Sequence, residues 1–246
     1  MTTETRPTVN ITFRIPGLWR HPTEMLDRLP DGFQVTDDRL ILPDQSEIEI
    51  FPMPPDGQFP SIFRSTLRRP ASPQELQVVD RYTANVVLTG PGGSLESARK
   101  MMQAGAAIMQ AGGAGVFIDN SGLSHGAESW VYMTEEGSSD AVSFAFVGIV
   151  RGKSEVWTTG MHVPGFPEII MKRADADADD RAIIEMIRYV CADDREVGNG
   201  HIIADENGPR FQIKHEFPES LNAPDAMHNP WGRMRMISVK DIAERN

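Results

Sequence analysis

The segment from Asn85 to His125 constrains the fold more than any other part of the chain. It reads NVVLTGPGGSLESARKMMQAGAAIMQAGGAGVFIDNSGLSH, which predicts a strand, a glycine loop, a helix, a second strand and a polar loop. The helix is expected from about Ser94 to Ala111, since apolar and small residues recur at helical spacing and Gly112-Gly113 follows as a C-cap. Gly105 lies in the middle of the apolar stripe, so we expect the helix to press closely onto the central strands there.

The rest of the chain also alternates between strand-like and helix-like patterns, with neighbouring strands expected to be antiparallel. The expected strands are 9–15, 33–36, 40–42, 47–53, 142–150, 155–161, 167–171, 202–204 and 210–215. The further expected helices are 22–29, 59–67 and 179–192. This order predicts an α+β fold, a mainly antiparallel sheet with helices packed on it. Two pseudo-repeated ferredoxin-like lobes would satisfy the same order.

One compact domain is expected over residues 9–222, with lobes at about 9–75 and 76–222. Prolines and a glycine interrupt the chain between 52 and 75, but aromatic residues in that stretch look buried, so it is not a flexible linker. Residues 223–246 carry a tryptophan and alternating apolar residues. We expect this C-terminal segment to dock on the body of the protein or on a partner.

Charge limits the partners that the chain can have. The net charge is −11, from 24 Lys and Arg against 35 Asp and Glu, which opposes the phosphate contacts that dominate nucleic-acid binding. The basic pairs Arg68-Arg69 and Arg233/Arg235 are too sparse to offset it. We therefore predict no nucleic-acid partner and no membrane partner. The N-terminus lacks the apolar core of a signal peptide, and the apolar stretches are shorter than the ~20 residues that span a bilayer, so a cytoplasmic location is expected.

Neither a cofactor nor a metal site is expected from the sequence. The single cysteine, Cys191, excludes an intramolecular disulfide and a thiolate zinc cluster. The histidines do not follow the spacing of zinc ligands. The acidic run ADADADD at 174–180 lacks the glycine and the final glutamate of a calcium loop. It is better explained as acidic residues that favour the N-terminus of the next helix.

The glycine loop is the first candidate binding site. Gly90, Gly92, Gly93 and Ser94 lie between a strand and a helix, where backbone amides can cradle a phosphate or another anion. The loop lacks both the Gly-Lys-Ser/Thr ending of a nucleotide P-loop and the pattern of a dinucleotide site, and Pro91 removes one amide donor. The alternative interpretation is a turn followed by Ser94 as the N-cap of the helix.

Two further loops carry candidate catalytic residues. Asp119 and His125 lie in the polar loop 119–128 and could act as general acid and base; the alternative is a turn built by Asx and Ser side chains. His162 and Glu168 frame the loop 160–168 and could face the first loop if their strands are neighbours. A rigid connection between two core strands explains the second loop equally well.

Four strings together carry a resemblance to a known family: TGPGGSLESARKMMQAGAA, GGAGVFIDNSGLSHG, SFAFVGIVRG and VWTTGMHVPGFPEIIM. The chain resembles a family of bacterial proteins classed only as a domain of unknown function, from about Glu47 to Arg188. The resemblance implies an α+β domain in a bacterial cytoplasm. It implies no activity and no catalytic residues.

Two functions follow from these patterns. The first is a non-enzymatic binding or scaffold domain, since no motif completes a catalytic pattern while several aromatic residues offer apolar contact area, for a protein partner or for self-association. The alternative is a hydrolase or transferase that acts on an anionic small molecule. Its site would combine the loops 90–94, 119–128 and 160–168.

Overall fold

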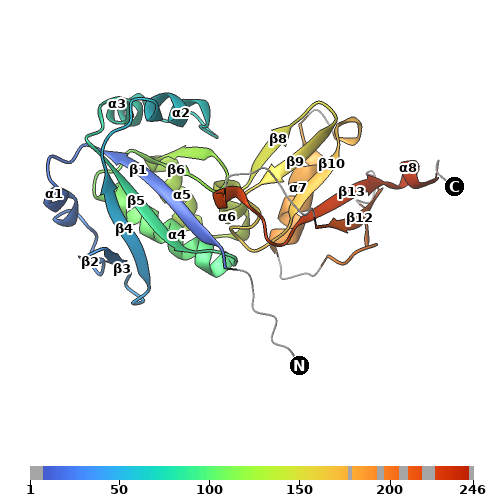
Figure 1. Ribbon diagram of the computed structural model, residues 1–246, viewed down its shortest axis with the longest axis horizontal. Helices are drawn as coiled ribbons and strands as arrows, with labels where there is room; N and C mark the ends of the chain where they lie inside the picture. Colours follow the sequence, from blue (N-terminus) through green and yellow to red (C-terminus); the bar gives the residue numbers. More distant parts are fainter. Residues whose placement is uncertain (1–7, 177–178, 193–196, 205–209, 218–224, 244–246) are drawn as a thin grey trace.

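The first half of the chain folds into a seven-stranded antiparallel sheet in the computed structural model (Figure 1). The strand order is β2-β3-β4-β5-β1-β6-β7. The bounds are β1 (Asn10–Gly17), β2 (Gln34–Thr36), β3 (Arg39–Ile41), β4 (Glu47–Met53), β5 (Ala84–Pro91), β6 (Gly115–Ile118) and β7 (Leu123–Gly126). The structure describes residues 8–176, 179–192, 197–204, 210–217 and 225–243.

Helices cover both faces of this sheet. Phe13 of β1 packs against Trp130 and Phe146 on one face, and Phe117 of β6 packs against Phe59 on the other. The helices of the first face are α4 (Leu95–Gln110), α5 (Ala127–Glu136) and α6 (Ser139–Phe146), with the short α1 (Pro22–Leu26) at the sheet's far end. Those of the second face are α2 (Phe59–Ser65) and α3 (Pro73–Arg81). The larger hydrophobic core therefore lies between the sheet and α4, α5 and α6.

The second half of the chain forms a six-stranded sheet in the order β11-β12-β13-β10-β9-β8. All of its strand pairs are antiparallel except β10 with β13, which is parallel. The bounds are β8 (Gly148–Arg151), β9 (Glu155–Thr159), β10 (Glu168–Lys172), β11 (Ile202–Ala204), β12 (Arg210–Glu216) and β13 (Arg233–Ser238). The helical segments of this half are η1 (Arg173–Asp175), α7 (Arg181–Ala192), η2 (Asp225–Met227) and α8 (Val239–Ala243). The apolar face of α7 and this sheet enclose a second core.

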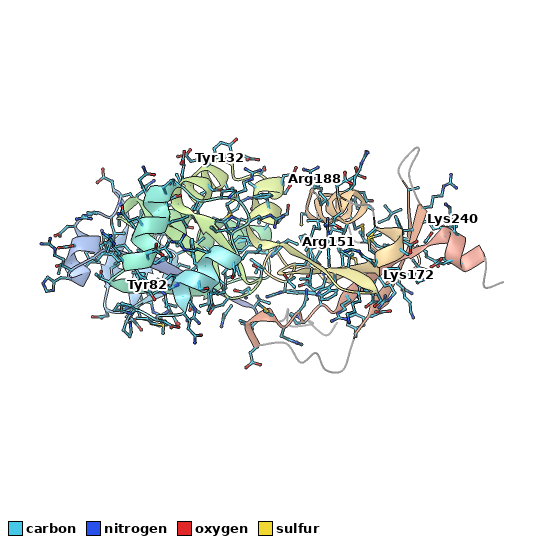
Figure 2. The ribbon with its side chains drawn as sticks, turned by 90° about the horizontal axis from the view of Figure 1, so that it is seen from above. Tyr82, Tyr132, Arg151, Lys172, Arg188 and Lys240 are labelled. Carbon is cyan, nitrogen blue, oxygen red and sulfur yellow. The ribbon has the colours of Figure 1, made fainter. Side chains whose placement is uncertain are left out.

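The α+β class expected from the sequence is confirmed, with two mainly antiparallel sheets that lie next to each other along the long axis (Figure 2). The change from one sheet to the other falls between residues 126 and 148, which differs from the expected lobe boundary near residue 75. The C-terminal segment supplies β13, which lies between β10 and β12 inside the second sheet. The pseudo-repeat stays a prediction.

The expected strand over residues 142–150 is wrong. The chain is helical in α6 as far as Phe146, and only Gly148–Arg151 is a strand. Ser138 begins the helix, because its side chain accepts the backbone N–H of Ala141. A short run that is apolar on all sides has no periodicity that separates a strand from a buried helix, and this cap was the overlooked signal.

The expected polar loop over residues 119–128 is also shorter than the sequence indicated. Leu123–Gly126 forms β7, which pairs with β6, and α5 begins at Ala127. The loop itself is therefore the turn of a β-hairpin, residues 119–122. The sequence did not predict this strand because Ser124 and His125 are polar, which suggested a solvent-exposed loop. In the structure both side chains are buried, one on each side of β7.

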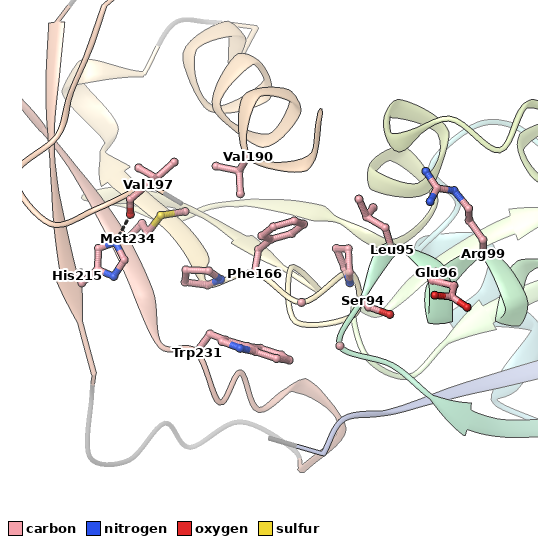
Figure 3. Close-up of a pocket in the computed structure, with 14 residues that line it drawn as sticks. Ser94, Leu95, Glu96, Arg99, Phe166, Val190, Val197, His215, Trp231 and Met234 are labelled. Carbon is pink, nitrogen blue, oxygen red and sulfur yellow. Dashed lines mark hydrogen bonds between the residues drawn. The ribbon is translucent and has the colours of Figure 1, made fainter. Parts of the chain in front are cut away.

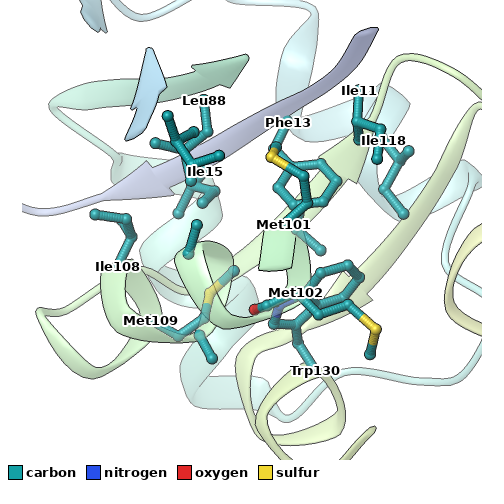
Figure 4. Close-up of a cluster of buried hydrophobic side chains, with 14 of the residues drawn as sticks. Ile11, Phe13, Ile15, Leu88, Met101, Met102, Ile108, Met109, Ile118 and Trp130 are labelled. Atoms are coloured by element: carbon teal, nitrogen blue, oxygen red, sulfur yellow. The ribbon is translucent and has the colours of Figure 1, made fainter. Parts of the chain in front are cut away.

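The expected helix over residues 94–111 is confirmed as α4, capped by the Ser94 side chain. Its apolar face packs on β1 and on Trp130 of α5 (Figure 4). A methyl group at Gly105 would lie 2.8 Å from Trp130 Nε1 and 3.5 Å from Phe13 of β1. The closest neighbour of Gly105 is therefore the indole of α5 and not the sheet. Among the described residues, no helix is both long enough and apolar enough to cross a membrane.

Candidate functional site

The three loops singled out in the sequence meet at the junction of the two sheets. The Gly93 N–H donates to Val163 O (2.8 Å), and Asn120 Nδ2 lies 3.3 Å from His162 Nε2. Gly165 has φ +95°, and a Cβ there would lie 2.4 Å from Gly93 O. Only glycine permits this contact, because a side chain would have no space and an unfavourable backbone conformation. The loops 90–94, 119–122 and 160–168 therefore form one packed joint.

Glu168 is the centre of that joint. Its Oε1 accepts the backbone N–H groups of Gly160 and Met161, both at 3.1 Å, and the side-chain amide of Asn229, also at 3.1 Å. Its Oε2 accepts the hydroxyl of Thr158 (2.7 Å). The residue is 7% exposed. A buried carboxylate with both oxygens occupied by protein donors orders the backbone around it and is not free for acid–base chemistry.

His162 and Asn120 extend this network to β1 and η2. His162 Nε2 donates to Ala226 O (3.0 Å), and Nδ1 lies 3.4 Å from Glu168 Oε1. Asn120 accepts the N–H of Thr12 and donates to the carbonyls of Asn10 and Ala226. Both side chains are 1% exposed. They fasten distant segments together, as expected for buried polar groups that are fully hydrogen-bonded.

Asp119 lies outside this network and forms an ion pair with Arg14. Nε and Nη2 of Arg14 donate to the two carboxylate oxygens at 2.8 and 2.9 Å, and this bidentate hydrogen bonding raises the pKa of Arg14. Arg14 follows Phe13 in β1, so the pair lies on the face of the first sheet opposite α4.

His125 lies on the α6 side of the same sheet, between Trp130 and Phe144. Its Nε2 donates to Ala145 O (2.9 Å), and its buried Nδ1 has no partner in the described part of the chain. Burial lowers the pKa of His125 to about 4; the hydrogen bond to Ala145 opposes the shift, and the charges of Arg68 and Arg69 add to it. The four candidate residues therefore occupy three separate places.

Acid is expected to destabilise the chain through His125. The pKa is about 4 in the folded chain against the ordinary 6.5, so between these values the unfolded chain binds a proton that the folded chain does not. The contribution of neutral His125 to stability is therefore fully present above about pH 6.5. As the pH drops toward 4, the free energy of unfolding falls by about 3 kcal/mol. Urea unfolding at about pH 7 and about pH 5 should show a smaller loss for His125→Gln than for the wild type. An equal loss in both would contradict the assignment to His125.

The glycine loop has few amides free for an anion. The Gly92 N–H donates to Val9 O (2.8 Å), the Gly93 N–H is bonded to the facing loop, and Gly90 is an interior residue of β5. The Ser94 hydroxyl accepts the Ser97 N–H as the helix N-cap (3.0 Å). The carboxylate of Glu96 in the first turn already interacts favourably with the positive end of the helix. Anion binding at this loop thus stays a prediction. The alternative interpretation, in which Ser94 is the N-cap of the helix, agrees with the hydrogen bond from the Ser97 N–H.

A cleft of about 840 Å³ opens beside the joint, between the two sheets (Figure 3). One wall is the start of α4, and the other is formed by the segment 164–167, α7, β12 and β13. Most of its lining is apolar or aromatic, and four polar side chains lie among these residues. The lining residues are Gly93, Ser94, Leu95, Glu96, Arg99, Pro164, Gly165, Phe166, Pro167, Val190, Val197, His215, Trp231 and Met234.

The polar side chains in the cleft are already engaged. Arg99 Nε donates to Gly137 O (2.8 Å), His215 Nε2 donates to Val197 O (2.8 Å), and Glu96 pairs with Lys100 (3.4 Å). In the described part of the chain, no group of three or more His, Cys, Asp or Glu side chains is placed to hold a metal ion. The cleft therefore offers a ligand both polar and apolar surface, and Trp231 and Phe166 are the aromatic side chains of its wall.

Sequence reasoning missed several residues of this region. Asn229 and Arg14 complete the partners of Glu168 and Asp119 but belong to no motif, and Trp231 was assigned only to a docking tail. Compared with protein-family models, with curated proteins and with solved structures, the chain finds no match. The resemblance to a bacterial domain of unknown function therefore stays a prediction.

Proposed function

We propose that this chain is a non-enzymatic binding domain whose ligand occupies the cleft between the two sheets. The observation that carries the proposal is the 840 Å³ cleft, with Trp231 and Phe166 in its wall. Ligand sites favour concave, mostly apolar surfaces between structural units, with a few polar groups for orientation. An apolar or aromatic group, on a small molecule or on a partner protein, fits this lining. A bacterial cytoplasm as the setting is part of the same proposal.

The alternative, a hydrolase or transferase acting on an anionic small molecule, has weaker support. Ser94 and Arg99 at the cleft wall favour it. Against it, Asp119, His125 and the pair His162–Glu168 lie in three places and are held by structural hydrogen bonds. A general acid or base must reach the proton that it transfers, and none of these residues lines the cleft.

The neutral dye N-phenyl-1-naphthylamine tests the cleft as an apolar site. The wild type is expected to raise the dye's fluorescence saturably, and Leu95→Glu should weaken this binding by about tenfold or more, because a carboxylate replaces apolar surface. Glutamate at the first position of α4 is compatible with the helix, since it interacts favourably with the N-terminal dipole.

Leu26→Glu is the matched control for this experiment. Leu26 is 38% exposed and lines a smaller apolar cavity beside Trp19, far along the first sheet. Dye binding that is lost with Leu26→Glu and kept with Leu95→Glu would contradict the proposal. If the cleft binds a second copy of the chain, light scattering after size exclusion will show a concentration-dependent mass that falls in Leu95→Glu.

A further inference from the structure

Arg68 and Arg69 lie against one aromatic ring at the edge where the two sheets meet. Their guanidinium carbons are 4.2 and 4.5 Å from the centroid of the Phe144 ring. Arg68 Nη1 donates to the Val147 carbonyl at the end of α6, and the Arg68 backbone N–H donates to Ser124 O of β7 (3.1 Å). The two cations are thus positioned by β7 and α6, and cation–π contacts of this kind restrict where a guanidinium can lie.

Among the described residues, no carboxylate balances these charges. In the described part of the chain neither Arg68 nor Arg69 forms an ion pair, although the chain has 35 acidic residues and 24 basic ones. Burial, and after it the charge of Arg69, lowers the pKa of Arg68 to about 10. A partly buried cation beside a second cation is unfavourable without an anion nearby.

A purely structural role explains one arginine and not the other. A cation at a helix C-terminus interacts favourably with the helix dipole, and Arg68 does so through Val147 O. Arg69 is exposed, and within the described part of the chain its guanidinium lies against the Phe144 ring. The five N–H donors of Arg69, and those of Arg68 that Val147 does not use, are available to a ligand.

We propose that Arg68 and Arg69 form a binding site for an oxyanion, a phosphate or carboxylate group, on the Phe144 side of the sheet junction. The planar guanidinium presents paired N–H groups that match the oxygens of these anions. His125 adds no positive charge to the site at neutral pH, because burial lowers the pKa of its imidazole to about 4. The site shares no residue with the cleft, so the proposal is independent of the function proposed above.

Titration of the full-length chain with inorganic phosphate, at an ionic strength held constant with sodium chloride, tests this site. The arginine Nε–H signals in nitrogen-15 NMR spectra should shift saturably in the wild type. Arg69→Gln should weaken the binding by about tenfold or more, as expected for the loss of a charge-assisted donor group. Arg64→Gln removes the same charge from an exposed arginine of α2 that pairs with Asp80 (2.5 Å), and should leave the binding unchanged.

A hexaglutamate peptide in the same titration identifies the source of the oxyanion. Tighter binding of the peptide than of phosphate would point to an acidic segment of a partner, and tighter binding of phosphate to a free or small-molecule phosphate; either supports the site if Arg69→Gln weakens it. Shifts no larger than those with chloride would overturn the proposal. Phosphate binding that is unchanged in Arg69→Gln would overturn it too. That result would instead favour the glycine loop at Gly90–Ser94 as the anion-binding site.

Discussion

Gly105→Leu is expected to destabilise the folded chain by roughly 1–3 kcal/mol or more, because α4 has no space for a side chain at this point. A Cβ at Gly105 would lie 2.8 Å from Trp130 Nε1 and 3.3 Å from Trp130 Cε2. Trp130 is fully buried and its Nε1 donates to Met102 O (3.1 Å). Its burial and this hydrogen bond fix the indole, so it cannot move away from Gly105 without a cost in free energy. Urea unfolding, followed by the far-ultraviolet circular dichroism of the helices, measures the loss.

Gly105→Ala is the sharper variant at this position. Helix propensity alone predicts that alanine stabilises by about 1 kcal/mol, whereas the contact with Trp130 predicts no gain or a net loss. Gln103→Leu is the control for the larger substitution, since Gln103 is exposed on the same helix and should change stability little. Trp130→Phe should partly relieve the penalty at Gly105 in the double variant. A full propensity gain in Gly105→Ala would mean that the helix is loosely packed here.

Much of the fold could be predicted because its elements carry local signals. The alternation of apolar and polar residues in β1 and the apolar stripe of α4 indicate which face of each element is buried. Ser94, as the N-cap, indicates where α4 begins. The same local reasoning failed at α6, since the mostly buried run from Val142 to Phe146 fits a buried strand as well as a helix. It also missed β7, where His125 is a core residue despite its polar side chain.

The site could not be predicted in the same way, because contacts between distant segments build it. Asn120 donates to Ala226 O across 106 residues of sequence, and no pattern of either segment shows this pairing. Arg68-Arg69 was weighed only as a weak basic patch, since its relation to Phe144 depends on how β7 meets α6. Sequence reasoning did identify the loops that meet at the junction. It did not show that their polar groups bind one another, which decides between a structural and a catalytic role.

Glu168→Ala should therefore act on stability, and strongly. Removing the carboxylate leaves the N–H groups of Gly160 and Met161 and the amide of Asn229 without their acceptor in a place that water does not reach. The expected destabilisation is roughly 3–5 kcal/mol, measured as a shift of the urea midpoint. Glu155→Ala, which removes a 37% exposed carboxylate from the neighbouring strand, should cost about 1 kcal/mol or less.

Glu168→Gln separates the two ways in which this carboxylate could hold the joint. The glutamine carbonyl can take the place of Oε1 and accept the same three N–H groups, while its amide faces the Thr158 hydroxyl, which can also accept. If the role of Glu168 is to supply acceptors, Glu168→Gln should lose less than half of what Glu168→Ala loses. Equal losses would show instead that the negative charge facing His162 Nδ1, 3.4 Å away, is what orders the loop 160–168. In that case His162→Gln should also destabilise the chain, because it removes the ring that faces this carboxylate.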